Sequence, residues 1–404
     1  MKSNALSTQS IKKQCDYPMI PYGRQDITTA DRDAVIEVLK SDFLTQGPAV
    51  PRFEMAVASH VGARHAVAVN SATSALHIAC IALGLGKEDI LWTSPITFVA
   101  SANCGLYCGA QVDFVDIDPN TYNLSLTALH SKLVIARELG QLPKILVVVH
   151  FSGQVADMQS IALLSQEFGF RIIEDASHAI GAKYKNEFVG NCRYSDITVF
   201  SFHPVKIITT GEGGMALTNS DDLARAMMLL RTHGINRDPA AMRETTHGPW
   251  YYEQSALGFN YRLTDIQAAL GSSQLTRLDS YVASRQKLAI RYRNLLSGFP
   301  ITLPWQNPDS YSSMHLYVIR LKLGKINKSQ LQIFNRMREL GIGVQLHYIP
   351  VHIHPFYRNL GFSEGDFPVA EAYYKDAISL PMYATLTEVE QDSVVNALKL
   401  ALDS

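Results

Sequence analysis

The sequence predicts an α/β protein, in which an open and mostly parallel sheet is covered by helices and is followed by a smaller C-terminal α+β domain. Short apolar runs alternate with helical patterns through the first 220 residues, an order typical of such sheets. Most of these runs are nearly continuous in valine, isoleucine and phenylalanine, as expected for strands buried on both faces. The 404 residues are 47% hydrophobic and 18% charged, so the chain can build a large core.

The first elements follow a polar N-terminal segment, residues 1–21, which we expect to be loose. Residues 28–42, TTADRDAVIEVLKSD, have the apolar spacing of an amphipathic helix, with Thr28 or Thr29 as its N-cap. Seven strand-like runs follow, at residues 65–70, 89–94, 111–117, 144–150, 170–175, 196–202 and 213–219. Helical patterns lie between several of them, at residues 71–86, 97–110, 125–140 and 157–169. The last two runs have no room for a crossover helix between them, so one strand pair there should be antiparallel.

The pattern changes after residue 220. A helical segment at 221–234 precedes a loop-like stretch at 235–260 and a long helical stretch at 264–298. The smaller domain is predicted from four further elements: a strand at 315–321, a helix at 329–341, a strand at 344–349 and a helix at 387–402. We place the boundary within the long helix. The predicted units are the polar segment 1–21, a large α/β domain 22–280 and a small α+β domain 281–404.

Composition excludes several classes of function. Thirty-six basic residues balance 37 acidic ones, and no run of lysine and arginine indicates binding to nucleic acid or to a membrane surface. The N-terminus lacks a continuous apolar segment and no later apolar run reaches 18 residues, so neither secretion nor membrane insertion is expected. The five cysteines have no CxxC spacing and stand mostly among apolar residues. We therefore predict a reducing, cytoplasmic compartment, in which these thiols behave as small hydrophobic groups.

Lys206 is the first candidate for chemistry, in the segment SFHPVKIITTGEGG at residues 201–214. Burying a charged amine costs several kcal/mol, on the order of 3–5 when it is unpaired. A lysine between Val205 and Ile207 therefore either extends to solvent or has a lowered pKa. A neutral amine is a nucleophile. This segment alone leaves both alternatives open.

Other candidates stand at the carboxyl ends of predicted strands, where ligands gather in parallel sheets. After Asn70, the helix start carries Ser71, Thr73 and Ser74, which suit either a phosphate or ordinary helix capping. Asp175 ends the strand 170–175. A carboxylate there needs a cationic or N–H partner, or else it caps a following helix that would place His178 one turn later.

Two more side chains belong to this edge of the sheet. Phe98 follows the strand 89–94 at a helix start, where an aromatic ring either faces a ligand or joins the core. His150 ends the strand 144–150 and is interpreted as structural. A lysine, an acid, an aromatic ring and a hydroxyl-rich helix start together match the needs of pyridoxal 5'-phosphate. Its aldehyde forms a Schiff base with lysine, its pyridine nitrogen needs an anion, its ring stacks and its phosphate needs donors.

Three segments carry a resemblance to a known family: EDASHAIGAKY, SDITVFSFHPVKIITTGEGGMALTN and GFNYRLTDIQAALG. They resemble the sugar aminotransferases of the DegT/DnrJ/EryC1/StrS family, and the likeness extends from about residue 22 to the C-terminus. It implies the type I pyridoxal phosphate aminotransferase fold, with a seven-stranded sheet, and a homodimer with shared active sites. It also implies that Lys206 is the Schiff-base lysine and that Asp175 pairs with the pyridinium nitrogen.

The resemblance implies roles for further residues. Phe98 would cover the cofactor ring, and Asn260 would reach the phosphate of the neighbouring subunit. His178 stands where many relatives have glutamine, near the phenolic oxygen of the cofactor, so its role is open between binding and catalysis. The phosphate would be held by Ala72, Thr73, Ser74 and Ser201. The sugar-nucleotide pocket would be lined by Tyr22, Asp42, Phe43, Leu44, Thr45, Gln345, His347 and Tyr348.

The substrate prediction rests on segments such as SDFLTQGP and NSATSALHIACIALG. Within the family they resemble most closely the aminotransferases of pseudaminic acid biosynthesis. This implies that UDP-4-keto-6-deoxy-N-acetyl-β-L-altrosamine is aminated at C4, with L-glutamate as donor. Residue spacing does not distinguish this substrate from another UDP-, GDP- or dTDP-linked 4-keto sugar.

Three other functions have less support. Relatives that dehydrate a sugar replace the lysine with histidine, whereas Lys206 is present. A non-enzymatic sensor on the same fold should lose Lys206 or Asp175, or gain a DNA-binding module. The histidines His347, His352 and His354 lie close together without acidic neighbours, and we expect no metal there.

Overall fold

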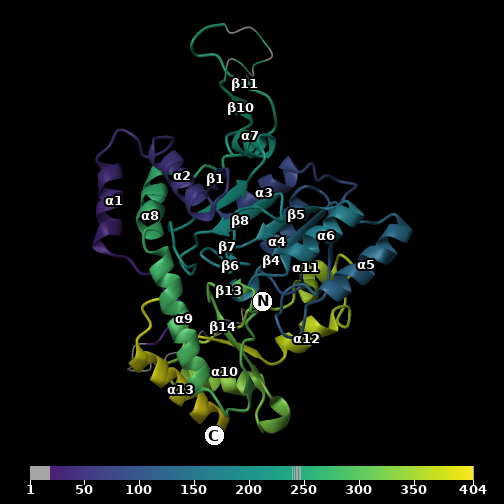
Figure 1. The fold of residues 1–404 in the computed structure, drawn as a ribbon, viewed down its shortest axis with the longest axis vertical. Coiled ribbons are helices and arrows are strands. Elements are labelled where there is room, and N and C mark those ends of the chain that lie inside the picture. Colours follow the sequence, from purple (N-terminus) through teal and green to yellow (C-terminus); the bar gives the residue numbers. More distant parts are fainter. Residues whose placement is uncertain (1–18, 239, 241, 243, 245–246, 404) are drawn as a thin grey trace, which may run out of the picture.

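The computed structural model describes residues 19–238, 240, 242, 244 and 247–403 (Figure 1). The predicted polar segment lies mostly outside the described residues. Helix α1 (Thr29–Leu39) forms as predicted, and Thr28 is its N-cap. The Thr28 amide donates to Asp31 at 2.8 Å in a capping box. Helix α2 (Ala49–Val61) follows and was not assigned from the sequence.

All seven predicted strand runs form one sheet. The strands are β1 (His65–Val69), β2 (Ile90–Thr93), β3 (Gln111–Phe114), β4 (Ile145–Val149), β5 (Arg171–Asp175), β8 (Ile197–Ser201) and β9 (Gly214–Thr218). Their order is β1-β9-β8-β5-β4-β2-β3. Strand β9 is antiparallel to β8, which confirms the predicted pair. It is also antiparallel to β1, a second pair that the sequence did not predict, because β9 inserts between β1 and β8.

Helices cover both faces of this sheet (Figure 1). They are α3 (Ala72–Ala82), α4 (Ala100–Tyr107), α5 (Leu126–Leu139), α6 (Met158–Phe168) and α7 (Asp221–Leu230), all within the predicted helical segments. Successive strand residues enter different hydrophobic clusters: Ile172 packs in one and Ile173 in the other. This alternation follows from the two-residue period of a strand, and it explains why these strands are apolar throughout.

The long helical stretch divides into α8 (Asp265–Leu275) and α9 (Leu278–Leu295). A third hydrophobic cluster then joins α9, α10 (Gln330–Glu339) and α13 (Glu388–Asp403) to a small sheet. This sheet has the order β12 (Ile301–Thr302), β14 (Tyr317–Leu321), β15 (Ala377–Leu380). A domain boundary at residues 280 and 281 remains a prediction.

Shorter elements connect these parts. They are β6 (Lys183–Tyr184), β7 (Glu187–Phe188), β10 (Ile235–Asn236), β11 (Glu253–Gln254), β13 (Ser310–Tyr311), η1 (Phe151–Gly153), η3 (Leu323–Lys325), η4 (Val351–Ile353), α11 (Pro355–Arg358) and α12 (Pro368–Tyr374). Strands β10 and β11 pair in the segment predicted as loop-like and lead into a projection at the top of Figure 1.

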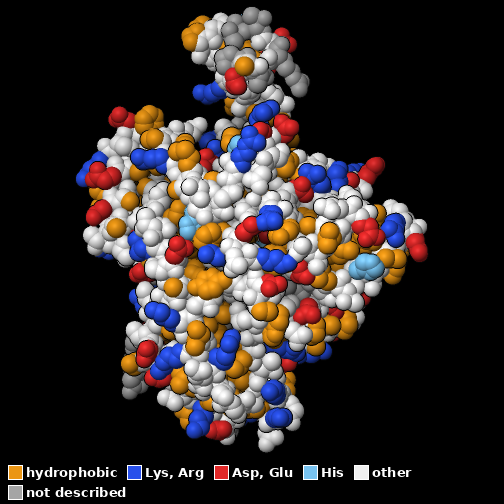
Figure 2. Space-filling view, viewed as in Figure 1, with side chains coloured by type: hydrophobic (Ala, Val, Ile, Leu, Met, Phe, Trp, Pro, Cys, Tyr) orange, Lys and Arg blue, Asp and Glu red, His pale blue; other side chains and the backbone are white. Residues whose placement is uncertain are grey.

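The predicted strand at 344–349 is wrong. Only Gln345 pairs with another backbone segment, through an isolated bridge to Ser379. The rest of this segment follows an irregular path along the cavity described below. On the visible face, basic side chains are interspersed with acidic ones (Figure 2). Among the described residues, no helix combines the length and apolar character needed to cross a membrane.

Candidate active site

A cavity of about 560 Å³ opens at the carboxyl ends of β5 and β8. Its walls come from the turn before α3, the start of α4, the linker after β8 and the C-terminal segments around residues 315 and 345–348. The cavity brings together most of the predicted site residues. They are Tyr22, Ala72, Thr73, Phe98, Asp175, His178, Ser201, Lys206, Gln345, His347 and Tyr348.

The other predicted residues do not line this cavity within the described part of the chain. Ser74 is buried, and its hydroxyl donates to Asn70 Oδ1 at 2.7 Å. Residues 42–45 lie beside the start of α8, where the Asp265 amide donates to the Leu44 carbonyl at 3.0 Å. Asn260 forms an isolated bridge with Thr232. The role predicted for Asn260 concerns a neighbouring subunit, which a single chain does not test.

Lys206 lies in the linker between β8 and β9, and its side chain faces the cavity. Burial lowers the pKa of its amine to about 8, although the Asp175 carboxylate opposes this shift. At pH 7 an amine with this pKa is still about nine-tenths protonated. The flanking Ile207 and Ile208 are buried. Of the two alternatives open from the sequence, the structure therefore favours the lysine with a lowered pKa.

Asp175 ends β5 and is only 6% exposed. Its Oδ2 accepts a hydrogen bond from the Ser101 hydroxyl at 2.6 Å, and its Oδ1 accepts one from the Ser177 amide at 3.1 Å. No helix follows, because the described residues 177–181 form turns and β6 begins at Lys183. The alternative of a helix N-cap is therefore wrong. Asp175 instead presents a hydrogen-bonded carboxylate to the cavity.

Ser101 was missed by the sequence analysis. It is fully buried in α4, and its hydroxyl also lies 2.7 Å from that of Thr97. Because Ser101 donates to Asp175, the Thr97 hydroxyl must donate to Ser101. The two hydroxyls stand four residues apart at a helix start on the predicted edge of the sheet. That spacing was the signal available in the sequence.

The partners of His178 determine which of its ring nitrogens carries the proton. The Ser152 amide donates to Nδ1 at 3.3 Å. Burial lowers the pKa of His178 well below its usual value, so the ring is neutral and its proton is on Nε2. This nitrogen lies 3.1 Å from the hydroxyl of Tyr348. His178 therefore donates to Tyr348, whose own proton remains available to a group in the cavity.

Two further histidines beside His178 and Tyr348 are also uncharged at neutral pH. Burial lowers the pKa of His347 to about 3, and its Nδ1 lies 2.8 Å from the Ser379 hydroxyl. His315 was predicted only as the first residue of a strand run, but it lines the cavity, with its ring centroid 4.4 Å from that of His178. Burial lowers its pKa well below the usual value. Burial also raises the pKa of Tyr348, so its hydroxyl stays protonated.

The turn between β1 and α3 offers backbone amides to an anion. Ala72 and Thr73, at the start of α3, line the cavity beside Ser201, and a helix N-terminus favours negative charge. Gly214 makes this packing possible, since a Cβ there would lie 2.4 Å from the Ala72 amide nitrogen. The ring of Phe98, 59% exposed, stands at the same cavity. A lysine amine, a carboxylate, an aromatic face and an anion cradle thus fit pyridoxal phosphate.

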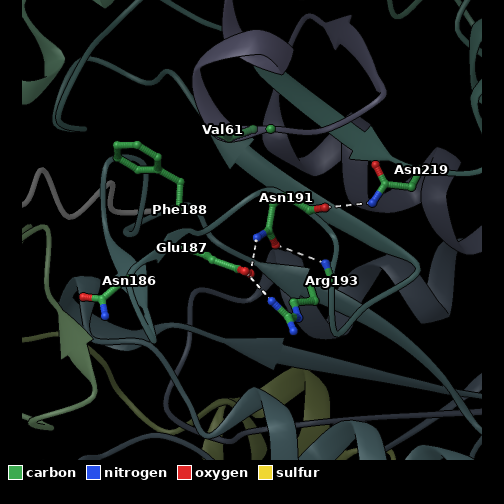
Figure 3. A pocket seen from close by; sticks show the side chains of 8 residues that line it. Val61, Asn186, Glu187, Phe188, Asn191, Arg193 and Asn219 are labelled. Atoms are coloured by element: carbon green, nitrogen blue, oxygen red, sulfur yellow. Dashed lines mark hydrogen bonds and ion pairs between the residues drawn. The ribbon is translucent and has the colours of Figure 1, made fainter.

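A second cavity, of about 450 Å³, is a weaker candidate (Figure 3). Its polar side chains mostly bind one another. Asn191 donates to Glu187 at 3.0 Å, Asn219 donates to the Asn191 carbonyl at 2.8 Å, and Arg193 pairs with Glu187. No lysine, cysteine, serine or threonine lines it among the described residues. In the described part of the chain, no group of three His, Cys, Asp or Glu side chains could hold a metal ion.

Comparisons with known proteins match most of the chain. The model of the DegT/DnrJ/EryC1/StrS aminotransferase family matches residues 25–399. The spore coat polysaccharide biosynthesis protein SpsC of Bacillus subtilis is 38% identical over 94% of this chain and 96% of its own length. The UDP-4-amino-4,6-dideoxy-N-acetyl-beta-L-altrosamine transaminase of Campylobacter jejuni is 38% identical over 90% of this chain and 93% of its own.

Solved structures of two proteins extend the likeness to three dimensions. Helicobacter pylori PseC, an aminotransferase involved in the biosynthesis of pseudoaminic acid, has a TM-score of 0.86 and 30% identity, covering 95% of this chain and 99% of its own. The PMP-form of the putative sugar aminotransferase Spr1654 from Streptococcus pneumoniae has the same TM-score at 27% identity, with the same coverage. A PLP-form of Spr1654 is also similar, with a TM-score of 0.85 and 27% identity, covering 95% of this chain and 99% of its own.

Proposed function

The chain belongs to the DegT/DnrJ/EryC1/StrS aminotransferase family, and from this premise we propose that it transfers an amino group from L-glutamate to C4 of a nucleotide-linked 4-keto-6-deoxy sugar. Its fold is that of the pyridoxal phosphate aminotransferases, and the enzyme is a PLP-dependent sugar aminotransferase. The observation that carries the proposal is the pairing of two groups in one cavity: an amine of lowered pKa and a buried carboxylate.

The proposed cofactor contacts follow from the positions of the side chains. Lys206 would hold the aldehyde carbon, Asp175 the ring nitrogen and Phe98 one face of the ring. The phosphate would be bound at the start of α3 by Ala72 and Thr73, with Ser201, and by Asn260 of a second copy, whereas the Ser74 hydroxyl donates to Asn70 instead. When bound, the cofactor supplies an electron sink for a carbanion and a carrier for the amino group.

The residues of this chain would supply the remaining chemistry. Lys206, with a pKa of about 8, can give up and regain a proton near neutral pH. It would carry the proton that leaves the α-carbon of glutamate in the first half of a ping-pong cycle, and return a proton to C4 of the sugar in the second half. Tyr348 would donate its free hydroxyl proton to an oxygen in the cavity, held in place by neutral His178.

The preferred sugar is UDP-4-keto-6-deoxy-N-acetyl-β-L-altrosamine. The identity to the Campylobacter jejuni transaminase and the likeness to PseC support this choice. GDP-perosamine synthase of Caulobacter vibrioides is 36% identical over 96% of this chain and 99% of its own, and this nearly equal identity favours a GDP-linked sugar as the second candidate. Tyr22, Gln345 and His347 would line the sugar pocket, together with residues 42–45.

The test offers the purified enzyme UDP-, GDP- and dTDP-linked 4-keto-6-deoxy sugars with glutamate, and identifies products by mass. We expect preferred amination of the UDP sugar and none by Lys206→Ala. Preference for a GDP or dTDP sugar would replace the substrate but keep the reaction. If no sugar is aminated and glutamate leaves the visible spectrum of the bound cofactor unchanged, the transaminase proposal is wrong.

A homodimer with shared sites completes the proposal. Residues 42–45 and Asn260 do not line the cavity of their own described chain, which supports their use in the cavity of a second copy. A cytoplasmic location is proposed from the cysteine pattern of the sequence.

A further inference from the structure

Three cysteines meet where α3 packs against α4, outside the lining of the active-site cavity. Cys80 is on α3, Cys104 is on α4, and Cys108 follows α4 as its C-cap, one helical turn after Cys104. Cys80 and Cys104 are fully buried in one hydrophobic cluster, and Cys108 packs against it with part of its surface exposed. The helices therefore place one accessible thiol beside two inaccessible ones.

The three thiols are close enough to influence one another electrostatically. Cys80 interacts with both Cys104 and Cys108, and Cys104 donates to the Ser101 carbonyl with a sulfur–oxygen distance of 3.3 Å. His77, whose Nδ1 lies 3.2 Å from the Tyr261 hydroxyl, is a neighbour of Cys108. The interaction with Cys80 and then that with His77 lower the pKa of Cys108 to about 6, although burial opposes them. Cys80, in contrast, has its pKa raised by its two neighbouring thiols and by burial.

Cys192 shows how differently another thiol of this chain is held. It is buried against β8 and β9, where its Sγ lies 3.2 Å from the Leu217 carbonyl oxygen and 3.4 Å from the Thr198 hydroxyl. Burial raises its pKa to about 12. Because the thiolate is the reactive form, Cys108 should react with electrophiles and oxidants at neutral pH, whereas Cys192 should not.

We propose that Cys108 is a peroxide-sensitive thiol and that Cys80 resolves its oxidised form as a disulfide between α3 and α4. The Cys108 thiolate attacks one oxygen of hydrogen peroxide, the O–O bond breaks, and the departing hydroxide takes up a proton to become water. Cys108 is then a sulfenic acid. The Cys80 thiol attacks its sulfur, the S–O bond breaks and a second water leaves with the Cys80 proton. Two thiols and one peroxide thus yield one disulfide and two waters.

This disulfide would join two helices whose N-terminal ends serve the active site. The start of α3 lines the cavity with Ala72 and Thr73, and α4 carries Ser101, which binds Asp175. The proposal does not depend on which sugar the enzyme aminates, because it concerns thiols outside the cavity.

The experiment treats the full-length holoenzyme with graded hydrogen peroxide, alkylates the remaining thiols, and identifies the peptides by mass spectrometry without reduction. We expect a linked peptide pair containing Cys80 and Cys108, which a dithiol reductant releases. In Cys80→Ser, the sulfenic acid on Cys108 should instead be captured by dimedone. Cys192→Ser is the matched control and should form the cross-link as the wild type does.

A second measurement on the wild type needs no variant. The alkylation rate of Cys108 should rise with pH through a midpoint near 6, while Cys192 stays unlabelled until the chain unfolds. The proposal is overturned if Cys108 is alkylated or oxidised no faster than Cys192. A disulfide that pairs Cys80 with Cys104 and leaves Cys108 free overturns it as well.

Discussion

Glu174 and Asp175 are adjacent carboxylates on β5 that serve opposite faces of the sheet. Glu174 is buried against β4 and β8, where its Oε2 lies 2.7 Å from His150 Nε2 and its Oε1 accepts the hydroxyls of Ser195 and Thr198. Asp175 accepts two hydrogen bonds but also lines the cavity with Lys206. One carboxylate is enclosed by protein partners, and the other keeps one side open.

This difference in surroundings makes Glu174 a structural charge and Asp175 a functional one. A buried carboxylate surrounded by donors rigidifies the fold. A carboxylate that faces a cavity can bind a group the chain itself lacks, and perturbed amines beside it mark functional sites. The dipeptide Glu-Asp carries no sign of this difference. The pleat of the strand creates it, because successive side chains point to opposite faces.

The largest effect should come from Asp175→Asn. An amide cannot supply the negative charge that a protonated pyridine nitrogen needs, so kcat should fall by about a thousandfold, or ~4 kcal/mol of barrier. The amide oxygen can still accept the Ser101 hydroxyl, so the free energy of unfolding should change by less than about 1 kcal/mol. Steady-state kinetics and chemical denaturation measure the two quantities. Turnover close to wild type would remove Asp175 from the site.

Glu174→Gln should produce the reverse pattern. Burial alone would raise the pKa of Glu174, but hydrogen bonds from His150, Ser195 and Thr198 lower it below the usual value. Replacing the carboxylate leaves a buried network partly unsatisfied, so the free energy of unfolding should fall by about 3 kcal/mol. In folded variant protein, kcat should stay within about threefold of wild type, since ~0.6 kcal/mol is a factor of three.

The free energy of unfolding at acidic pH tests whether Glu174 is a stabilising charge. A carboxylate whose pKa is lower in the folded than in the unfolded state stabilises the protein at pH values above its unfolded pKa, and this contribution is lost as pH falls through its folded pKa. The wild type should therefore lose stability relative to Glu174→Gln below about pH 4.5. Parallel curves for the two proteins would show that Glu174 is not a stabilising charge.

The sequence was sufficient for the seven strands because each is a short apolar run between helical patterns. It did not reveal the second antiparallel pair, since strand order depends on contacts distant along the chain. The strand predicted at 344–349 has suitable residues, but only Gln345 finds a backbone partner. Lys206 was predicted because it stands in an apolar run, and Asp175 and Phe98 were predicted because Asp175 ends a strand and Phe98 follows one. Ser101 and His315 were missed because a buried hydroxyl on a helix, and a histidine opening a strand run, look structural in sequence.

The Lys206 amine lies on the same side of the sheet as Asp175, whose charge acts on it across the cavity. Its pKa of about 8 predicts that the rate at which apoprotein binds pyridoxal phosphate rises about tenfold from pH 7 to pH 9 and then levels off. In Asp175→Asn the levelling should shift to lower pH, because the carboxylate opposes the effect of burial. Stopped-flow absorbance measures the rates. A rise that continues to pH 10.5 would indicate an amine that is not desolvated.

Ser101→Ala tests how the open carboxylate is held. Removing the hydroxyl leaves Asp175 with one hydrogen bond, from Ser177, and frees Thr97 from its partner. We expect kcat to fall about fivefold, close to the ~1 kcal/mol of one hydrogen bond, with KM for glutamate nearly unchanged. Thr97→Val, which removes only the more distant hydroxyl, should have a smaller effect. A rise in KM without a change in kcat would assign Ser101 to substrate binding instead.

The smallest effect should come from His178→Gln. Histidine accepts from the Ser152 amide through Nδ1 and donates to Tyr348 through Nε2, and a glutamine amide offers one acceptor and one donor in the same way. Activity should therefore stay within about twofold, since only a few tenths of a kcal/mol separate equivalent hydrogen bonds. His178→Leu has neither group and should lower kcat by about tenfold, because Tyr348 loses the donor that directs its own proton into the cavity. Equal activities of the glutamine and leucine variants would mean that His178 fills space rather than orienting Tyr348.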